Sequence, residues 1–120
     1  MDKDMKKIKT EEELSNAIRE NDIVVAKFGA DWCGPCKVLE ENIEAIEKEN
    51  ADTAEFLEID VDDADEGFVD KYYLRGLPVS YFFKEGEKAY VVEGLMTKEQ
   101  ILERIAILKF VEDINMLKRE

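Results

Sequence analysis

The chain has 120 residues, of which 17 are Lys or Arg and 30 are Asp or Glu, so its formal charge is −13. This charge argues against nucleic acids and anionic membrane surfaces as partners, because both bind to basic protein surfaces. Histidine is absent, which excludes every catalytic mechanism and metal site that uses imidazole. The length predicts a single domain, residues 1–120.

The N-terminal segment carries no visible targeting signal. No apolar segment follows residues 1–7, and no run of about 18 apolar residues could cross a bilayer. The two cysteines lie too close together to brace a secreted disulfide scaffold. The sequence therefore predicts a cytoplasmic protein.

The first half of the chain alternates between helical and strand patterns. Thr10 and Glu13 form a capping box, which predicts a helix from residue 11. Residues 23–28 are apolar except for one lysine, as expected for a strand buried inside a parallel sheet. A second helix is predicted to begin around the cysteines, with Pro35 in its first turn. Its predicted inner stripe consists of Leu39, Ile43 and Ile46.

The second half adds a hairpin and a terminal helix. The predicted elements are a strand at 56–61, a short helix at 68–73, strands at 79–83 and 90–92 joined through Glu85–Gly86, and a helix that follows the capping box of Thr97 and Gln100. With a short strand allowed before the first helix, this order predicts an α/β fold. Its mixed central sheet would carry helices on both faces and an extended C-terminal helix.

The most acidic stretch is residues 58–66. It does not fit an EF-hand loop, because the glycine and ligand positions cannot be matched together. We expect a solvated loop that favours partners with basic surfaces.

The chemical motif is Cys33-Gly34-Pro35-Cys36, which lies where the predicted buried strand gives way to a helix. The first-turn amides and the dipole of a helix stabilise an anion, so Cys33 should ionise more readily than a free thiol. Cys36 follows about one helical turn later, close enough to form a disulfide. The spacing predicts that Cys33 attacks a substrate disulfide and that Cys36 then attacks Cys33 to release the reduced substrate.

Two other uses of a cysteine pair are weaker. A zinc site needs four ligands, and without further Cys or His the metal would have to bridge two chains or recruit carboxylates. A purely structural disulfide this short would close almost no loop and would stabilise little. The pair is therefore predicted to be redox-active, with no bound metal or cofactor.

Residues 28–37, Phe-Gly-Ala-Asp-Trp-Cys-Gly-Pro-Cys-Lys, resemble the active-site segment of the thioredoxin family. Residues 75–78 resemble the family's loop with a cis-proline, residues 83–87 its hairpin, and Gly94 a glycine of its substrate groove. The likeness covers about residues 6–108, which leaves 109–120 as a C-terminal helical extension. It implies a thioredoxin fold and dithiol–disulfide exchange on proteins.

The resemblance also implies roles for single residues. Cys33 would be the exposed nucleophile and Cys36 the buried resolving thiol. The implied partners are disulfide-containing proteins and an electron donor of the thioredoxin-reductase type, supplied ultimately by NADPH or ferredoxin, and a monomer is expected. The implied docking surface for a substrate segment consists of Trp32, Gly34, Pro35, Gly76, Leu77, Pro78 and Gly94.

Lys27 departs from the family pattern, which has a buried aspartate six residues before the first cysteine. Glu58, on the same face of the next strand as Phe56, is the expected partner of reversed charge. A cation at this position would favour thiolates and make the cysteine pair more oxidising. Alternatively, Lys27 extends to solvent and leaves the sulfurs unaffected. Gly29 also departs, because it stands where many relatives have an aromatic residue.

The C-terminal extension has its own pattern. Ile107, Phe110, Ile114 and Leu117 fall on one helical stripe. We expect them either to pack on the domain and fray at the tip or to contact a partner or a second copy.

Three functions stay open from the sequence. The first is a protein-disulfide reductase, favoured by Leu77 before Pro78 and by the missing signal peptide. The second is an adaptor whose groove binds a partner without turnover, although an adaptor has no need of both Cys33 and Cys36. The third is a more oxidising, specialised disulfide exchanger, which Lys27 favours.

Overall fold

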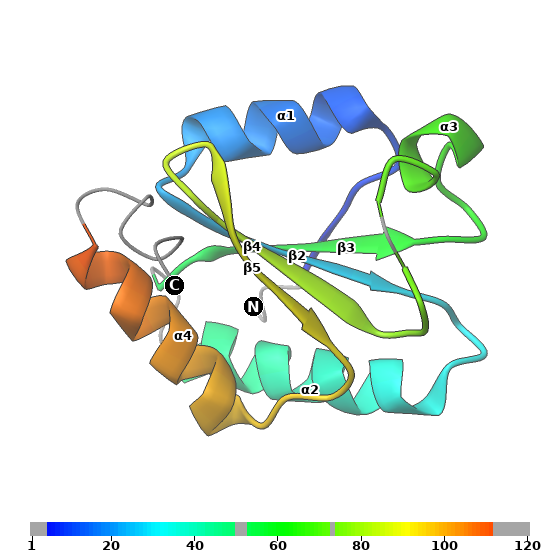
Figure 1. The fold of residues 1–120 in the computed structure, drawn as a ribbon. Helices are drawn as coiled ribbons and strands as arrows, with labels where there is room; N and C mark the ends of the chain where they lie inside the picture. The colour runs from blue at the N-terminus through cyan, green and yellow to red at the C-terminus, as the bar shows by residue number, and fades with distance from the viewer. Residues whose placement is uncertain (1–4, 50–52, 73, 112–120) are drawn as a thin grey trace.

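The computed structural model describes residues 5–49, 53–72 and 74–111 (Figure 1). The elements within these residues are, in chain order, β1 (Lys6–Lys7), α1 (Glu11–Glu20), β2 (Ile23–Gly29), α2 (Gly34–Glu49), β3 (Glu55–Asp60), α3 (Glu66–Val69), β4 (Val79–Lys84), β5 (Glu87–Glu93) and α4 (Lys98–Phe110).

The strands form one mixed sheet in the order β1-β3-β2-β4-β5. The central strand β2 pairs in parallel with β3 and antiparallel with β4, and every one of its residues is buried, as its apolar sequence predicts. Helices α1 and α3 lie on one face of the sheet, and α2 and α4 lie on the other (Figure 1). The predicted α/β fold class with helices on both faces is confirmed.

Both predicted capping boxes are formed. At the start of α1, the Glu13 backbone N–H donates to Thr10 Oγ1 over 3.1 Å, and the Glu13 carboxylate accepts from the Thr10 backbone N–H. Thr97 and Gln100 make the same reciprocal pair of bonds before α4. Each box satisfies amide donors that a helix N-terminus would otherwise leave unpaired, so these two helix starts could be located from the sequence.

The hairpin between β4 and β5 is also where the sequence places it. Glu85 and Gly86 have φ angles of +50° and +87°, the positive values of a type I′ turn. This turn continues the twist of its two strands, which is why a two-residue loop is sufficient here.

Two predicted boundaries around the acidic loop are shifted. β3 ends at Asp60, one residue early, because the backbone N–H groups of Asp63 and Ala64 bond to the Asp60 carbonyl and turn the chain. The short helix predicted at 68–73 is found at Glu66–Val69, because the Asp65 carbonyl already accepts bonds from Phe68 and Val69. The aromatic residues Phe68 and Tyr72 indicate which side chains pack against the core, but they do not show at which residue the helix begins.

The C-terminal helix is shorter than predicted. α4 ends at Phe110, and Val111 is extended (φ −86°, ψ 119°), so the helix does not continue through Val111 as expected. Its core contacts come from Ile101, Ile105 and Leu108, whereas Ile107 and Phe110, on the predicted stripe, are 40% and 87% exposed. The rest of that stripe, Ile114 and Leu117, lies outside the described residues.

The sheet has a separate apolar core on each face. One core fills the space between the sheet and helices α2 and α4, and the other packs under α1 and α3. No helix in the described part of the chain is long and apolar enough to cross a bilayer.

Candidate active site

The cysteine pair lies at the junction of the central strand and the longest helix described. β2 ends at Gly29 and α2 begins at Gly34, and the Cys33 N–H donates to the Ala30 carbonyl over 3.1 Å, which closes the turn between them. Cys33 and Cys36 are joined by a disulfide, with their Cα atoms 5.3 Å apart. The motif thus lies at the N-terminus of a helix, as predicted.

This N-terminus is set up to hold a negative charge on Cys33. The Cys36 backbone N–H points at Cys33 Sγ over 3.2 Å. When the disulfide is reduced, a thiolate on Cys33 would keep this bond and would face the positive end of the α2 dipole. The N–H groups in the first turn of a helix have no partner within the helix. Pro35 has no N–H, so its position there leaves no donor unpaired.

The expectation that Cys33 is exposed is wrong for this disulfide form. Cys33 is 5% exposed and Cys36 is 2% exposed. Ala30, Val61 and Leu77 pack around the disulfide and cover it. Cys33 is nevertheless the more accessible sulfur-bearing residue of the two.

Among the described residues, the cysteines do not form a metal site with other side chains. The two sulfurs are bonded to each other, and no group of three or more Cys, His, Asp or Glu side chains among the described residues could hold a metal ion.

The predicted docking residues come from three segments, and several of them meet beside the disulfide. The Leu77–Pro78 peptide bond is cis, and Leu77 packs against the cysteines. The Gly94 N–H donates to the Pro78 carbonyl over 2.8 Å, which joins the loop after β5 to the loop before β4. Gly94 has a φ of +90°, a conformation that favours glycine.

The surface around these residues is partly open. Gly34, Pro35 and Gly76 are exposed, whereas Pro78 is buried. An open cleft of about 530 Å³ lies next to Val61 and Leu77, the residues that pack on the disulfide. Its lining consists of Val61, Val69, Asp70, Tyr72, Leu74, Gly76 and Leu77.

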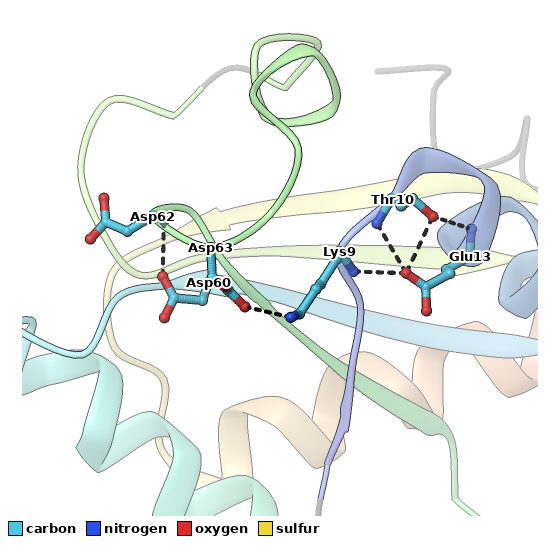
Figure 2. A network of polar contacts seen from close by, with 6 residues as sticks. All are labelled: Lys9, Thr10, Glu13, Asp60, Asp62 and Asp63. Atoms are coloured by element: carbon cyan, nitrogen blue, oxygen red, sulfur yellow. Dashed lines mark hydrogen bonds and ion pairs between the residues drawn. The ribbon is translucent and has the colours of Figure 1, made fainter.

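Trp32 is 72% exposed, and the acidic loop holds it in place. Its indole N–H donates to Asp62 Oδ2 over 2.7 Å, and the Asp62 backbone N–H donates to Asp60 Oδ1 over 2.9 Å. Figure 2 shows this loop beside Lys9, whose ammonium group is 3.2 Å from Asp63. Asp62 was missed as a site residue because it lies 30 positions from Trp32, and nothing in the local sequence connects them.

Lys27 is buried beneath the disulfide, and the alternative that it extends to solvent is wrong. The residue is 2% exposed, and its Nζ donates to the Cys36 carbonyl over 3.1 Å. Its Nζ also lies 3.8 Å from Glu40 Oε2 on α2. Glu40 was not predicted, although its position four residues after Cys36 places both on the same side of that helix.

Glu58 is beside Lys27 but is not the partner in that ion pair. The two residues are register partners in β2 and β3, so they lie on one face of the sheet, as predicted. The carboxylate described within 4 Å of Lys27 Nζ is that of Glu40 instead. Burial raises the pKa of Glu58 above its ordinary value of 4.5, and the charge of Lys27 opposes this rise.

The raised pKa of Glu58 predicts a pH-dependent cost to folding. Below pH 4.5 Glu58 is protonated in both the folded and unfolded chain. As the pH rises through the folded-state pKa, the folded chain must release a proton that it binds more tightly, so this group lowers the free energy of unfolding. Thermal melts of Glu58→Gln should match wild type at acidic pH and gain on it toward neutrality. A difference in Tm that stays constant with pH would contradict this prediction.

Comparisons with known proteins agree with the geometry. A sequence model of the thioredoxin family matches residues 5–107. The chain is 35% identical to thioredoxin of Mycoplasmoides gallisepticum over 99 residues, covering 82% of this chain and 97% of that protein. It is 31% identical to thioredoxin of Bacillus subtilis over 98 residues, covering 82% and 93%.

Solved structures show the same similarity. The N21Q mutant thioredoxin from Halobacterium salinarum superimposes with a TM-score of 0.81 at 32% identity, covering 92% of this chain and 95% of that one. Chloroplastic thioredoxin z superimposes with a TM-score of 0.76 at 29% identity, covering 91% and 97%.

The fold, the position of the disulfide and the sequence match point to one family. Its redox group is the cysteine disulfide itself, without a bound cofactor. The family implies disulfide substrates and an electron-donating reductase. The chain belongs to the thioredoxin family of thiol–disulfide oxidoreductases.

Proposed function

We propose that this protein reduces the disulfides of protein substrates, with Cys33 as the nucleophile and Cys36 as the resolving thiol. The observation that carries the proposal is the Cys36 N–H, which points at Cys33 Sγ over 3.2 Å at the start of α2. A bond of this kind stabilises a thiolate on Cys33. Cys36 lies deeper, at 2% exposed, which suits an internal attack on Cys33 better than an attack on a substrate.

The reaction takes place in two exchange steps. The Cys33 thiolate attacks one sulfur of the substrate disulfide, forms the mixed disulfide and displaces the other substrate sulfur as a thiolate. Cys36 then gives up its proton, attacks Cys33 Sγ and breaks the mixed disulfide. The released substrate sulfur takes up a proton. The substrate gains two electrons and the cysteine pair loses two, so a reductase must return the pair to the dithiol.

The proposed docking surface surrounds this disulfide. Trp32, Gly34 and Pro35 are exposed next to the cysteines in the sequence. Leu77 packs on the cysteines, and the bond between Gly94 and Pro78 holds two loops together. An extended substrate segment that pairs with the backbone of Gly76 and Leu77 would place its sulfur beside Cys33.

We propose that this protein works in the cytoplasm, because a disulfide reductase works only where its own cysteine pair is kept reduced. Its electron donor would be an enzyme of the thioredoxin-reductase type. We propose that it acts as a monomer, because the exchange chemistry uses two cysteines of one chain.

The test is turnover on a protein disulfide. Wild type should accelerate the reduction of insulin by dithiothreitol, followed as precipitation of the free insulin B chain. The matched control is Cys33→Ser/Cys36→Ser, which should leave only the uncatalysed rate. A wild-type rate equal to that of the control would overturn the proposal, and equal binding of both proteins to a substrate would then favour the adaptor.

A further inference from the structure

Lys27 is a buried cation whose side chain contacts α2, one of the two helices on its face of the sheet (Figure 1). Its Nζ donates to the Cys36 carbonyl over 3.1 Å and lies 3.8 Å from Glu40 Oε2. Burying an ammonium group is costly unless charged or polar partners compensate for the lost water. Here one partner belongs to the backbone of a redox cysteine, and the other is a side chain one helical turn further along α2.

The side chain of Lys27 also approaches the sulfur of Cys36. A Cβ atom placed on Gly29 would lie 3.1 Å from Cys36 Sγ and 3.2 Å from Lys27 Cε. The two atoms are therefore no farther apart than the sum of these distances, and the ammonium nitrogen is one bond beyond Cε. The absence of a side chain at Gly29 leaves the space between the end of the Lys27 side chain and Cys36 Sγ unfilled by a Cβ atom.

The other groups around Lys27 come from two strands. Glu58 on β3 and Ser80 on β4 are its register partners, and both share its face of the sheet. The negative charges of both Glu40 and Glu58 therefore attract the ammonium group of Lys27. Glu40 lies at ion-pair distance, and Glu58 is half-buried on the neighbouring strand.

We propose that Lys27 is a positioning residue for the resolving step: its ammonium group, held by the Cys36 carbonyl, stabilises the Cys36 thiolate, and Glu40 moderates that effect. The inference rests on the proposed exchange reaction and adds no reactant to it. The cation lowers the free energy of the species in which Cys36 has lost its proton and is about to attack Cys33.

The charges of Lys27 and Glu40 should shift the equilibrium between the disulfide and the dithiol in opposite directions. A cation beside Cys36 favours the reduced, deprotonated pair, whereas the disulfide is uncharged and gains nothing. Lys27 therefore makes the pair more oxidising than it would be without the charge. The Glu40 carboxylate opposes the thiolate and makes the pair less oxidising. Removing the charge of Lys27 should shift the equilibrium toward the disulfide, and removing the charge of Glu40 should shift it toward the dithiol.

Equilibration with reduced and oxidised glutathione at pH 7 tests this pattern. Lys27→Met removes the charge with little change in length, and it should shift the equilibrium constant about tenfold toward the disulfide, equivalent to about 30 mV. Glu40→Gln should shift the constant about threefold toward the dithiol, a smaller effect because Glu40 is partly solvated.

A buried lysine far from the sulfurs provides the matched control. Lys84 is 6% exposed and is paired with Asp22 over 2.8 Å, on the same face of the sheet as Lys27 but four residues further along β4 from Ser80. Lys84→Met and Lys27→Met should both lower the thermal stability, but Lys84→Met should leave the glutathione equilibrium within about twofold of wild type.

A second measurement follows the Cys36 thiol directly. In Cys33→Ser, Cys36 is the only thiol, and its ionisation can be followed by the ultraviolet absorbance of the thiolate. Adding Lys27→Met should move this ionisation to higher pH, whereas loss of a merely structural lysine would leave it in place.

The inference is wrong if Lys27→Met leaves the equilibrium unchanged, or if Lys27→Met and Glu40→Gln shift it in the same direction. If Lys27→Met does not fold, Glu40→Gln decides alone, because its side chain is partly exposed and its loss should be tolerated. These results are distinct from failure of the proposed function, in which wild type itself does not accelerate insulin reduction.

Discussion

Replacing Cys36 with serine should turn the protein from a catalyst into a trap for its substrates. Cys33 keeps the Cys36 N–H at its sulfur, since that donor belongs to the backbone, and it should still attack a substrate disulfide. Without a second thiol the mixed disulfide is not resolved. Turnover on insulin should fall by more than about a thousandfold, because removing a group that breaks or forms the reacting bond abolishes the cycle.

The adduct itself is the readout. Mass spectrometry under non-reducing conditions should find Cys36→Ser joined to the substrate, and dithiothreitol should release it. The matched variant Cys33→Ser should lose as much turnover but form little adduct. Cys36 is only 2% exposed, and the N–H group that would stabilise a thiolate is directed at Cys33 Sγ and not at the sulfur of Cys36. If Cys33→Ser captured as much substrate as Cys36→Ser does, the assignment of Cys33 as the nucleophile would be wrong.

The largest loss of stability is expected from Phe28→Ala. Phe28 is fully buried at the centre of β2, and its ring centroid lies 4.9 Å from that of Tyr72, 5.5 Å from that of Tyr81 and 6.1 Å from that of Phe68. Truncating a buried phenylalanine removes its transfer free energy and leaves a cavity, which costs about 3–5 kcal/mol. Urea unfolding of the disulfide form should show this as a lower midpoint.

Phe28 contributes to the core of the fold and lies on the other face of the sheet from Lys27. It faces the core under α1 and α3, and among the described residues its cluster meets the packing around the disulfide only through Val61 and Leu77. Val91→Ala on β5 is the matched truncation at a 43% exposed site, and it should change the free energy of unfolding by about 0.5 kcal/mol or less. A loss below about 1 kcal/mol for Phe28→Ala would show that the aromatic cluster can close over the gap.

Much of the molecule depends on contacts between residues close in sequence, and these could be predicted. Thr10 with Glu13 and Thr97 with Gln100 begin their helices through bonds across three residues. The apolar run of β2 marks a strand covered on both faces. The turn at Glu85–Gly86 follows from two residues with positive φ. Where a helix ends is less strongly encoded, and α4 stops at Phe110 without a glycine or proline to stop it.

The α/β fold, the position of the cysteine pair at a helix start and the face of the sheet that carries Lys27 could all be predicted without a structure. Each follows from a period of two or 3.6 residues or from a bond within one turn. Three contacts could not be predicted and were found in the folded chain: Asp62 holds Trp32, Gly94 bonds to Pro78, and Lys27 forms its ion pair with Glu40 instead of Glu58. Strand alternation fixes the face to which a side chain belongs. How far a flexible side chain reaches, and which partner it meets, depends on how α2 and the loops dock on the sheet, and that docking is set by the packing of the whole core.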